Sequence, residues 1–168
     1  MLDQLTDNFP AFVSKLGDDA EPEQILPGAT DDEIAKKEKL LGIPLPDSYK
    51  RFLKLTRGFD LFGGAVQFGP QHPFIHDFPK IGELSDAQRK VVQMRGGGWP
   101  PPSQGMLCFA EYFRDADGDQ VLFDVANGLT DGEYPVVYYS HETRPPTVTK
   151  LADSFAEWLN ECCIDQMA

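Results

Sequence analysis

The sequence predicts an α+β domain in which a mainly antiparallel sheet packs against an N-terminal αα-hairpin and a C-terminal helix. Three observations lead to this fold class: two amphipathic helix patterns in residues 30–58, three segments of strand composition in residues 106–140, and one more helix pattern after residue 150. A single domain spanning residues 1–168 is expected, because this length with 41% hydrophobic and 25% charged residues suits one core.

The first helix is predicted to begin near Asp31 and to end at Gly42. Thr30 and Glu33 have the T-x-x-E spacing of a capping box, in which each side chain satisfies the other residue's free backbone N–H. Gly42 provides the left-handed conformation that commonly ends a helix.

One face of this helix carries Ile34, Glu38 and Leu41 at positions i, i+4 and i+7. A carboxylate beside an apolar stripe must be hydrogen-bonded, so we expect Glu38 to bind the N–H groups of a neighbouring loop rather than to act in catalysis. Three lysines are expected to point mainly away from this face: Lys36, Lys37 and Lys39.

Two prolines, Pro44 and Pro46, hold Leu45 extended between the helices, because a residue that precedes proline is displaced from the α region. Pro46 is expected in the first turn of the second helix, where its missing N–H is not needed. The second helix is predicted to end before Gly58 and to bury one stripe of side chains. That stripe consists of Tyr49, Phe52, Leu53 and Thr56.

The later elements are predicted from composition and spacing. Residues 59–68 are aromatic and glycine-interrupted, which indicates a bent strand or a hairpin, and residues 85–95 predict a further helix. Short links between the three strand segments favour antiparallel pairing; the segments are 106–110, 120–125 and 134–140. The last helix is predicted from the stripe of Leu151, Phe155, Trp158, Leu159 and Cys162.

Charge and composition exclude several functions. The net charge of −12, from 27 acidic and 15 basic side chains, disfavours binding to phosphate backbones and anionic membranes. The same charge argues against reading the helix pair as a DNA-binding helix-turn-helix. With three cysteines, no apolar run of about 20 residues and no signal-peptide pattern, the protein is expected in the cytoplasm.

We expect that none of the residue patterns resembling catalytic or metal-binding motifs forms a working site. Asp115, Asp117 and Asp119 begin like a calcium loop, but the required glycine and bidentate glutamate are missing, so a strand-joining turn at Gly118 is predicted. His72 and His76 are four residues apart, yet an intervening proline prevents the helix that would align them. We therefore expect no enzyme, no cofactor and no metal.

The motif I-x-x-x-E-x-x-L-G-I-x-L-P-x-x-Y-x-x-F-L, from Ile34 to Leu53, resembles the opening motif of the SUKH superfamily. The resemblance covers about residues 25–163, with Arg57-Gly58 in place of the family's common Asn-Gly and a long insertion at residues 96–105. It implies structural roles for Ile34, Glu38, Leu41, Gly42, Leu45, Pro46, Tyr49, Leu53, Gly58, Gly118 and Asp119.

The resemblance also implies function, because the superfamily includes fungal regulators of cell-wall synthesis and bacterial immunity proteins that neutralise toxins, often nucleases. It is not an enzyme family. The leading hypothesis is an immunity protein that binds a cognate toxin domain, and the acidic balance fits a basic toxin. The alternative is a regulatory scaffold domain of the cell-wall type. The toxin's reaction and the oligomeric state are left open.

A partner surface is predicted where carboxylates concentrate, although a run of charge is usually only a solvated face. Residues 111–133 hold seven carboxylates against the single base Arg114. If six of them cluster at one end of the sheet, they form a negative patch that steers a basic partner: Glu111, Asp115, Asp117, Asp119, Asp131 and Glu133. The aromatic residues 59–68 and the loop around Trp99 are the other candidates.

Overall fold

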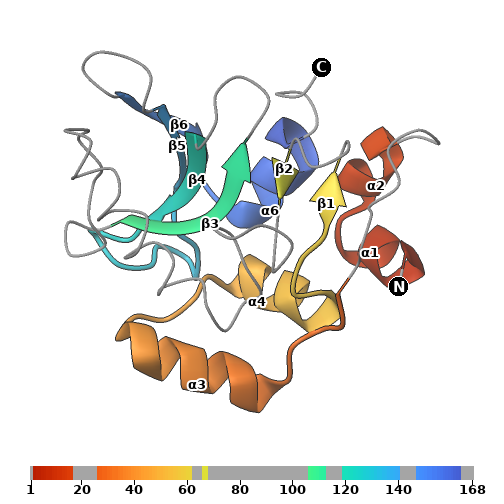
Figure 1. Ribbon diagram of the computed structural model, residues 1–168, viewed down its shortest axis with the longest axis horizontal. Helices are drawn as coiled ribbons and strands as arrows, with labels where there is room; N and C mark the ends of the chain where they lie inside the picture. The colour runs from red at the N-terminus through yellow and green to blue at the C-terminus, as the bar shows by residue number, and fades with distance from the viewer. Residues whose placement is uncertain are drawn as a thin grey trace.

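The computed structural model describes residues 2–16, 26–61, 66–67, 106–112, 119–140 and 147–163. In these segments, one antiparallel sheet is accompanied by a helical hairpin, which lies below it in Figure 1, and by the first and last described helices, which lie toward its right. The predicted α+β class is confirmed. The helix predicted at residues 85–95 and the loop around Trp99 lie outside the described segments.

The helical hairpin consists of α3 (Asp31–Leu41) and α4 (Asp47–Leu55). The capping box of Thr30 and Glu33 is present in full, and Gly42 ends α3 with φ 72°, as the sequence predicts. One detail is corrected. Pro46 is the N-cap of α4, with extended φ −66° and ψ 147°, and the helix begins one residue later than expected.

The buried faces of the two helices follow the predicted stripes with one exception. Ile34 and Tyr49 are buried, and Leu45 between the helices is fully buried. Lys37, which the sequence analysis placed on the outer side, is only 4% exposed. The reason is geometric, because position 37 is three residues after Ile34 and therefore shares its side of the helix.

Two short helices precede this hairpin, α1 (Leu2–Asn8) and α2 (Pro10–Leu16), and the sequence analysis did not predict them. Leu5, Phe9 and Phe12 are fully buried. The Phe12 N–H, in the first turn of α2, donates to the Asn160 side-chain oxygen at 3.0 Å, near the end of the described chain.

Within the described segments, the sheet has six strands in the order of the chain, each antiparallel to the next. They are β1 (Asp60–Leu61), β2 (Val66–Gln67), β3 (Met106–Tyr112), β4 (Asp119–Asp124), β5 (Val136–Ser140) and β6 (Thr147–Ala152). Pairing of β1 with β2 confirms the hairpin predicted at residues 59–68. Strand β6 was not predicted, and it contains Leu151, which had been assigned to the last helix.

The last helix begins at α6 (Phe155–Glu157), after the Ser154 cap, and continues as the π-helix η4 (Trp158–Cys162). The wider π turn is closed by the Cys163 N–H, which donates to the Trp158 carbonyl at 2.7 Å. This turn changes the predicted stripe, because Cys163 is fully buried while Cys162 is only half-buried.

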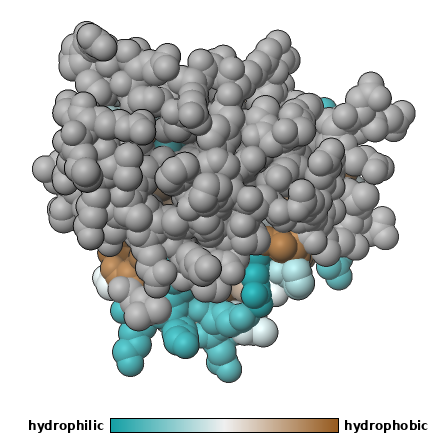
Figure 2. Space-filling view, in the orientation of Figure 1, coloured by the Kyte–Doolittle hydropathy of each residue, from teal (hydrophilic) through white to brown (hydrophobic). Residues whose placement is uncertain are grey.

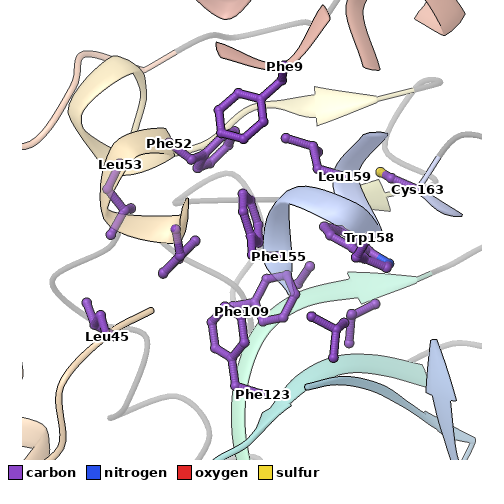
Figure 3. Packing of buried hydrophobic residues seen from close by; sticks show 14 of the residues in the cluster. Phe9, Leu45, Phe52, Leu53, Phe109, Phe123, Phe155, Trp158, Leu159 and Cys163 are labelled. Carbon is purple, nitrogen blue, oxygen red and sulfur yellow. The ribbon is translucent and has the colours of Figure 1, made fainter. Parts of the chain in front are cut away.

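The core is built from aromatic rings that several elements contribute, as Figure 3 shows. Phe109 and Phe123, from adjacent strands, stack with ring centroids 4.1 Å apart. The Phe155 ring of α6 packs against this pair. The Phe9 ring, which comes from between α1 and α2, has its centroid 6.2 Å from that of Phe155. Within the described segments, none of the helices has the length and apolar character that a membrane crossing requires.

Candidate binding surface

A tight turn at residues 130–133 lies beside the start of α4. Thr130 and Glu133 exchange two backbone hydrogen bonds of 3.0 Å. The two central residues both have positive φ, 51° at Asp131 and 79° at Gly132, which is the type I′ geometry that Asp-Gly favours. Asp131 is exposed, so the turn displays its carboxylate from a defined backbone.

This turn supplies the hydrogen-bond acceptors that the start of α4 lacks, since its N-cap Pro46 makes no side-chain bond. The Gly132 carbonyl accepts from the Asp47 N–H at 2.9 Å. The Glu133 carboxylate accepts from the Ser48 N–H at 2.8 Å and from the Ser48 hydroxyl at 2.6 Å. A carboxylate at this position is favourable because the free N–H groups of a helix start carry partial positive charge.

Further contacts join the turn to neighbouring elements. The Ser48 hydroxyl oxygen accepts from the Ala156 N–H of α6 at 3.2 Å, and the Tyr134 hydroxyl donates to the Pro44 carbonyl at 3.1 Å. The φ of 79° at Gly132 favours glycine, and a Cβ atom there would also displace the Asp47 carboxylate. The turn, α4 and α6 therefore form one connected junction.

The predicted role of Glu38 is confirmed at this junction, because its carboxylate accepts from the Leu45 N–H at 2.8 Å. Lys50 lies between two carboxylates, 2.9 Å from Asp47 and 3.7 Å from Glu38. Burial alone would lower the pKa of the Lys50 ammonium, but Asp47, followed by Glu38, raises that pKa above its ordinary value.

We call four carboxylates of this junction the acidic corner: Glu38, Asp47, Asp131 and Glu133. The cation Lys50 pairs with the first two of them. Burial raises the pKa of the Tyr134 hydroxyl there, and the charge of Glu38 adds to the effect. The corner therefore carries a net negative charge, and its exposed Asp131 carboxylate makes no hydrogen bond or ion pair with the described residues.

Helices α3 and α4 are joined by ion pairs along their length. Arg57, at the position where the superfamily commonly has Asn, bonds both Glu33 oxygens at 2.8 and 2.9 Å, and Lys54 meets Asp31 at 2.6 Å. Between the helices lies an open groove of about 420 Å³. Its lining is mostly charged: Asp31, Ile34, Asp47, Lys50, Arg51 and Lys54. This end of the molecule, at the bottom of Figure 2, is largely hydrophilic, unlike the apolar pockets that hold small ligands.

The six carboxylates proposed as one patch do not cluster at one end of the sheet. Strand register places Glu111 and Asp119 at the start of β4, where β3 ends, whereas the turn holding Asp131 and Glu133 follows the far end of β4. A six-residue strand separates the two ends by about 17 Å. The single-patch interpretation is therefore corrected, since β4 runs between the two groups.

Several residues that the sequence analysis considered lie outside the described segments: the candidate site residues Trp99, Asp115, Asp117 and Gly118, and the rejected metal ligands His72 and His76. In the described part of the chain, no three metal-ligating side chains come together. The three cysteines are free, and burial raises the pKa of the Cys163 thiol, which makes it a poor nucleophile.

Sequence reasoning missed Ser48 and Lys50 as parts of this junction. Their partners are distant in sequence, since Ser48 meets Glu133 across 85 positions. One local signal was available: Asp131-Gly132 is a strong turn dipeptide, and its turn is the piece that meets α4.

Fold and junction define an α+β domain whose helical hairpin is fixed to the end of an antiparallel sheet. Comparison with family models gives the particular family. The SMI1 / KNR4 family (SUKH-1) matches residues 28–161, and the chain belongs to it. Among curated proteins, no significant match was found. Helices α1 and α2 precede the matched range.

Proposed function

We propose that this chain is a non-enzymatic protein-binding domain, an immunity protein that binds a cognate toxin domain and neutralises it. The observation that carries the proposal is membership of the SMI1 / KNR4 family (SUKH-1). The net charge of −12 supports a basic partner, such as a nuclease whose groove must attract phosphate.

An acidic inhibitor affects first the rate at which it associates with a basic enzyme. Complementary fields raise the association rate, and salt screens them over about 8 Å at physiological ionic strength. The exposed Asp131 carboxylate, on a turn that five backbone and side-chain hydrogen bonds hold in place, is a ready-formed contact for a basic side chain. Little loop ordering would then be needed on binding.

The experiment begins with the reading frames beside this gene and co-expresses the chain with a toxin-like domain encoded there. We expect the chain to restore growth, to co-purify with that domain, and to associate more slowly as salt rises. Neither rescue nor binding would contradict the immunity proposal. Binding to proteins of cell-wall synthesis, without rescue, would favour the regulatory scaffold instead.

The two ends of β4 can then be compared. Asp115, Asp117 and Asp119 changed together to Asn probe the sequence that leads from β3 into β4, and Asp131→Asn probes the turn after β4. Loss of steering at low salt is expected to slow association about tenfold for the triple variant. Unchanged, salt-independent association of both variants would show that these carboxylates are only a solvated face.

A further inference from the structure

The helical hairpin is a basic part of an acidic chain. Residues 31–57 hold seven bases and five acids, a net charge of +2, whereas the whole chain carries −12. Among the described segments, only the one that contains this hairpin is net positive. The hairpin is therefore the described part of the molecule that is best suited to attract an anion.

The positive charges of the hairpin meet at the groove between α3 and α4. Its described lining comprises three bases, two acids and Ile34, which is only 4% exposed and gives the groove an apolar patch. The bases are Lys50, Arg51 and Lys54, which come from the side of α4 opposite its buried stripe. A groove of this kind combines a small apolar contact with a local excess of positive charge.

Arg51 is the cation of the groove that the fold leaves unused. Lys50 pairs with Asp47 and Lys54 pairs with Asp31, whereas the exposed Arg51 guanidinium makes no ion pair or hydrogen bond with the described residues. The motif Y-x-x-F-L leaves position 51 unspecified, so the fold does not require a base there. A guanidinium binds a carboxylate through two parallel N–H bonds, which makes a carboxylate its natural ligand.

We propose that the groove between α3 and α4 binds an acidic peptide segment of a partner protein. A carboxylate of the segment binds Arg51 and Lys54, and an apolar side chain beside it contacts Ile34. This inference goes beyond the proposed toxin binding, concerns a ligand of opposite charge and does not depend on that function.

Asp31 occupies the position on Lys54 that the carboxylate of the segment would take. The Asp31 carboxylate lies 2.6 Å from the Lys54 ammonium, but the Asp31 side chain is 82% exposed. An exposed ion pair contributes little to stability, because water solvates both partners well. Lys54 can therefore exchange Asp31 for a carboxylate of the ligand at small cost.

Charges along the groove also orient the segment. Asp47, at the start of α4, belongs to the acidic corner, so it repels a carboxylate from that end and favours its placement between Arg51 and Lys54. Nucleic acid is disfavoured, because its closely spaced phosphates would meet Asp31 and Asp47 as well as the bases.

The test uses a fluorescein-labelled pentapeptide in which a central leucine lies between pairs of glutamates. Its binding to the full chain is followed by fluorescence anisotropy. We expect saturable binding with a dissociation constant below about 1 mM, and weaker binding as salt rises. The same peptide with glutamine in place of glutamate should bind about tenfold more weakly, since it cannot form charged bonds with Arg51.

Two pairs of variants locate the site. Arg51→Gln should weaken binding about fivefold or more, and its matched control is Lys36→Gln, which loses the same charge from an exposed position outside the described groove lining. Asp31→Asn should strengthen binding about two- to threefold, because it frees Lys54. Asp32→Asn removes the neighbouring exposed carboxylate, which is not part of that lining, and should leave the affinity nearly unchanged.

Three outcomes would overturn the proposal. These are the absence of saturable binding by the glutamate peptide, equal affinities of Arg51→Gln and Lys36→Gln, and equal affinities of Asp31→Asn and Asp32→Asn. Tighter binding of a labelled oligothymidine than of the peptide would show that the groove binds phosphates and that the proposal is wrong. Urea midpoints equal to the parent's would establish that the variants are folded. The assay contains no toxin domain, so its failure and that of the immunity proposal are distinguishable.

Discussion

Removing the Glu133 carboxylate tests whether the 130–133 turn holds the start of α4. In Glu133→Ala, the N–H and the hydroxyl of Ser48 both lose their acceptor, and Ser48 is fully buried. Hydrogen bonds to a charged group contribute about 1.5–3 kcal/mol each, but Glu133 itself is half-buried and water can partly replace it. We therefore expect the free energy of unfolding to fall by about 2–4 kcal/mol.

Two further variants refine this expectation. Glu133→Gln keeps one acceptor oxygen and loses the charge that favours a helix start, so its loss should be about 1–2 kcal/mol. Asp131→Asn is the matched control, because it changes an exposed neighbour in the same turn and Asn tolerates positive φ. Its stability should stay within about 0.5 kcal/mol of the parent.

The assay is urea denaturation followed by circular dichroism, with the slope of each transition compared to confirm two-state behaviour. A double-mutant cycle with Ser48→Ala should give a coupling energy on the order of 1 kcal/mol, because both variants remove the same hydroxyl–carboxylate bond. Equal unfolding free energies for Glu133→Ala and the parent would refute the reasoning. The turn would then lie beside α4 without stabilising it.

Three other measurements extend these tests. Tyr49→Ala removes a ring packed at 5.0 Å from Phe155 and should lower stability by about 2–5 kcal/mol; an unchanged urea midpoint would contradict its role in the core. Hydrogen bonds from Thr30, then the charge of Arg57, lower the pKa of Glu33 in the folded state. Ionised Glu33 therefore contributes to folding stability above its unfolded pKa of about 4.3, and this contribution is lost as pH falls through the lower folded pKa. Glu33→Gln should therefore reduce the difference in stability between pH 7 and pH 3, and an identical pH profile would argue against this linkage. EDTA should leave the thermal midpoint unchanged, and a shift of several degrees would reveal a structural metal.

Local patterns in the sequence predicted the hairpin well, because the deciding interactions are between near neighbours. The capping box, the left-handed Gly42 and the bond from Leu45 to Glu38 all lie within seven residues of their partners. The patterns predicted less well which residues at the edge of a helix face are buried, as Lys37 shows.

The missed elements have physical reasons. Helices α1 and α2 have seven residues each, below the length at which a helix is stable alone, so packing rather than propensity maintains them. Strand β6 is exposed at four successive positions and shows no alternation of burial that a pattern would reveal. The role of Glu133 depends on a contact with Ser48 that only the folded chain creates.

Docking of α2 on η4 has a consequence for the order of events during synthesis. Phe12 and Asn160 are 148 positions apart, and Lys15 donates to the Glu161 carbonyl across 146. The first helices therefore leave the ribosome long before η4, although Phe9 and Phe12 already meet Phe52 and Phe59 from the early part of the chain. The contacts of α2 with Asn160 and Glu161 can form only after those residues have emerged, so the docking of α2 on η4 belongs to the late steps of folding.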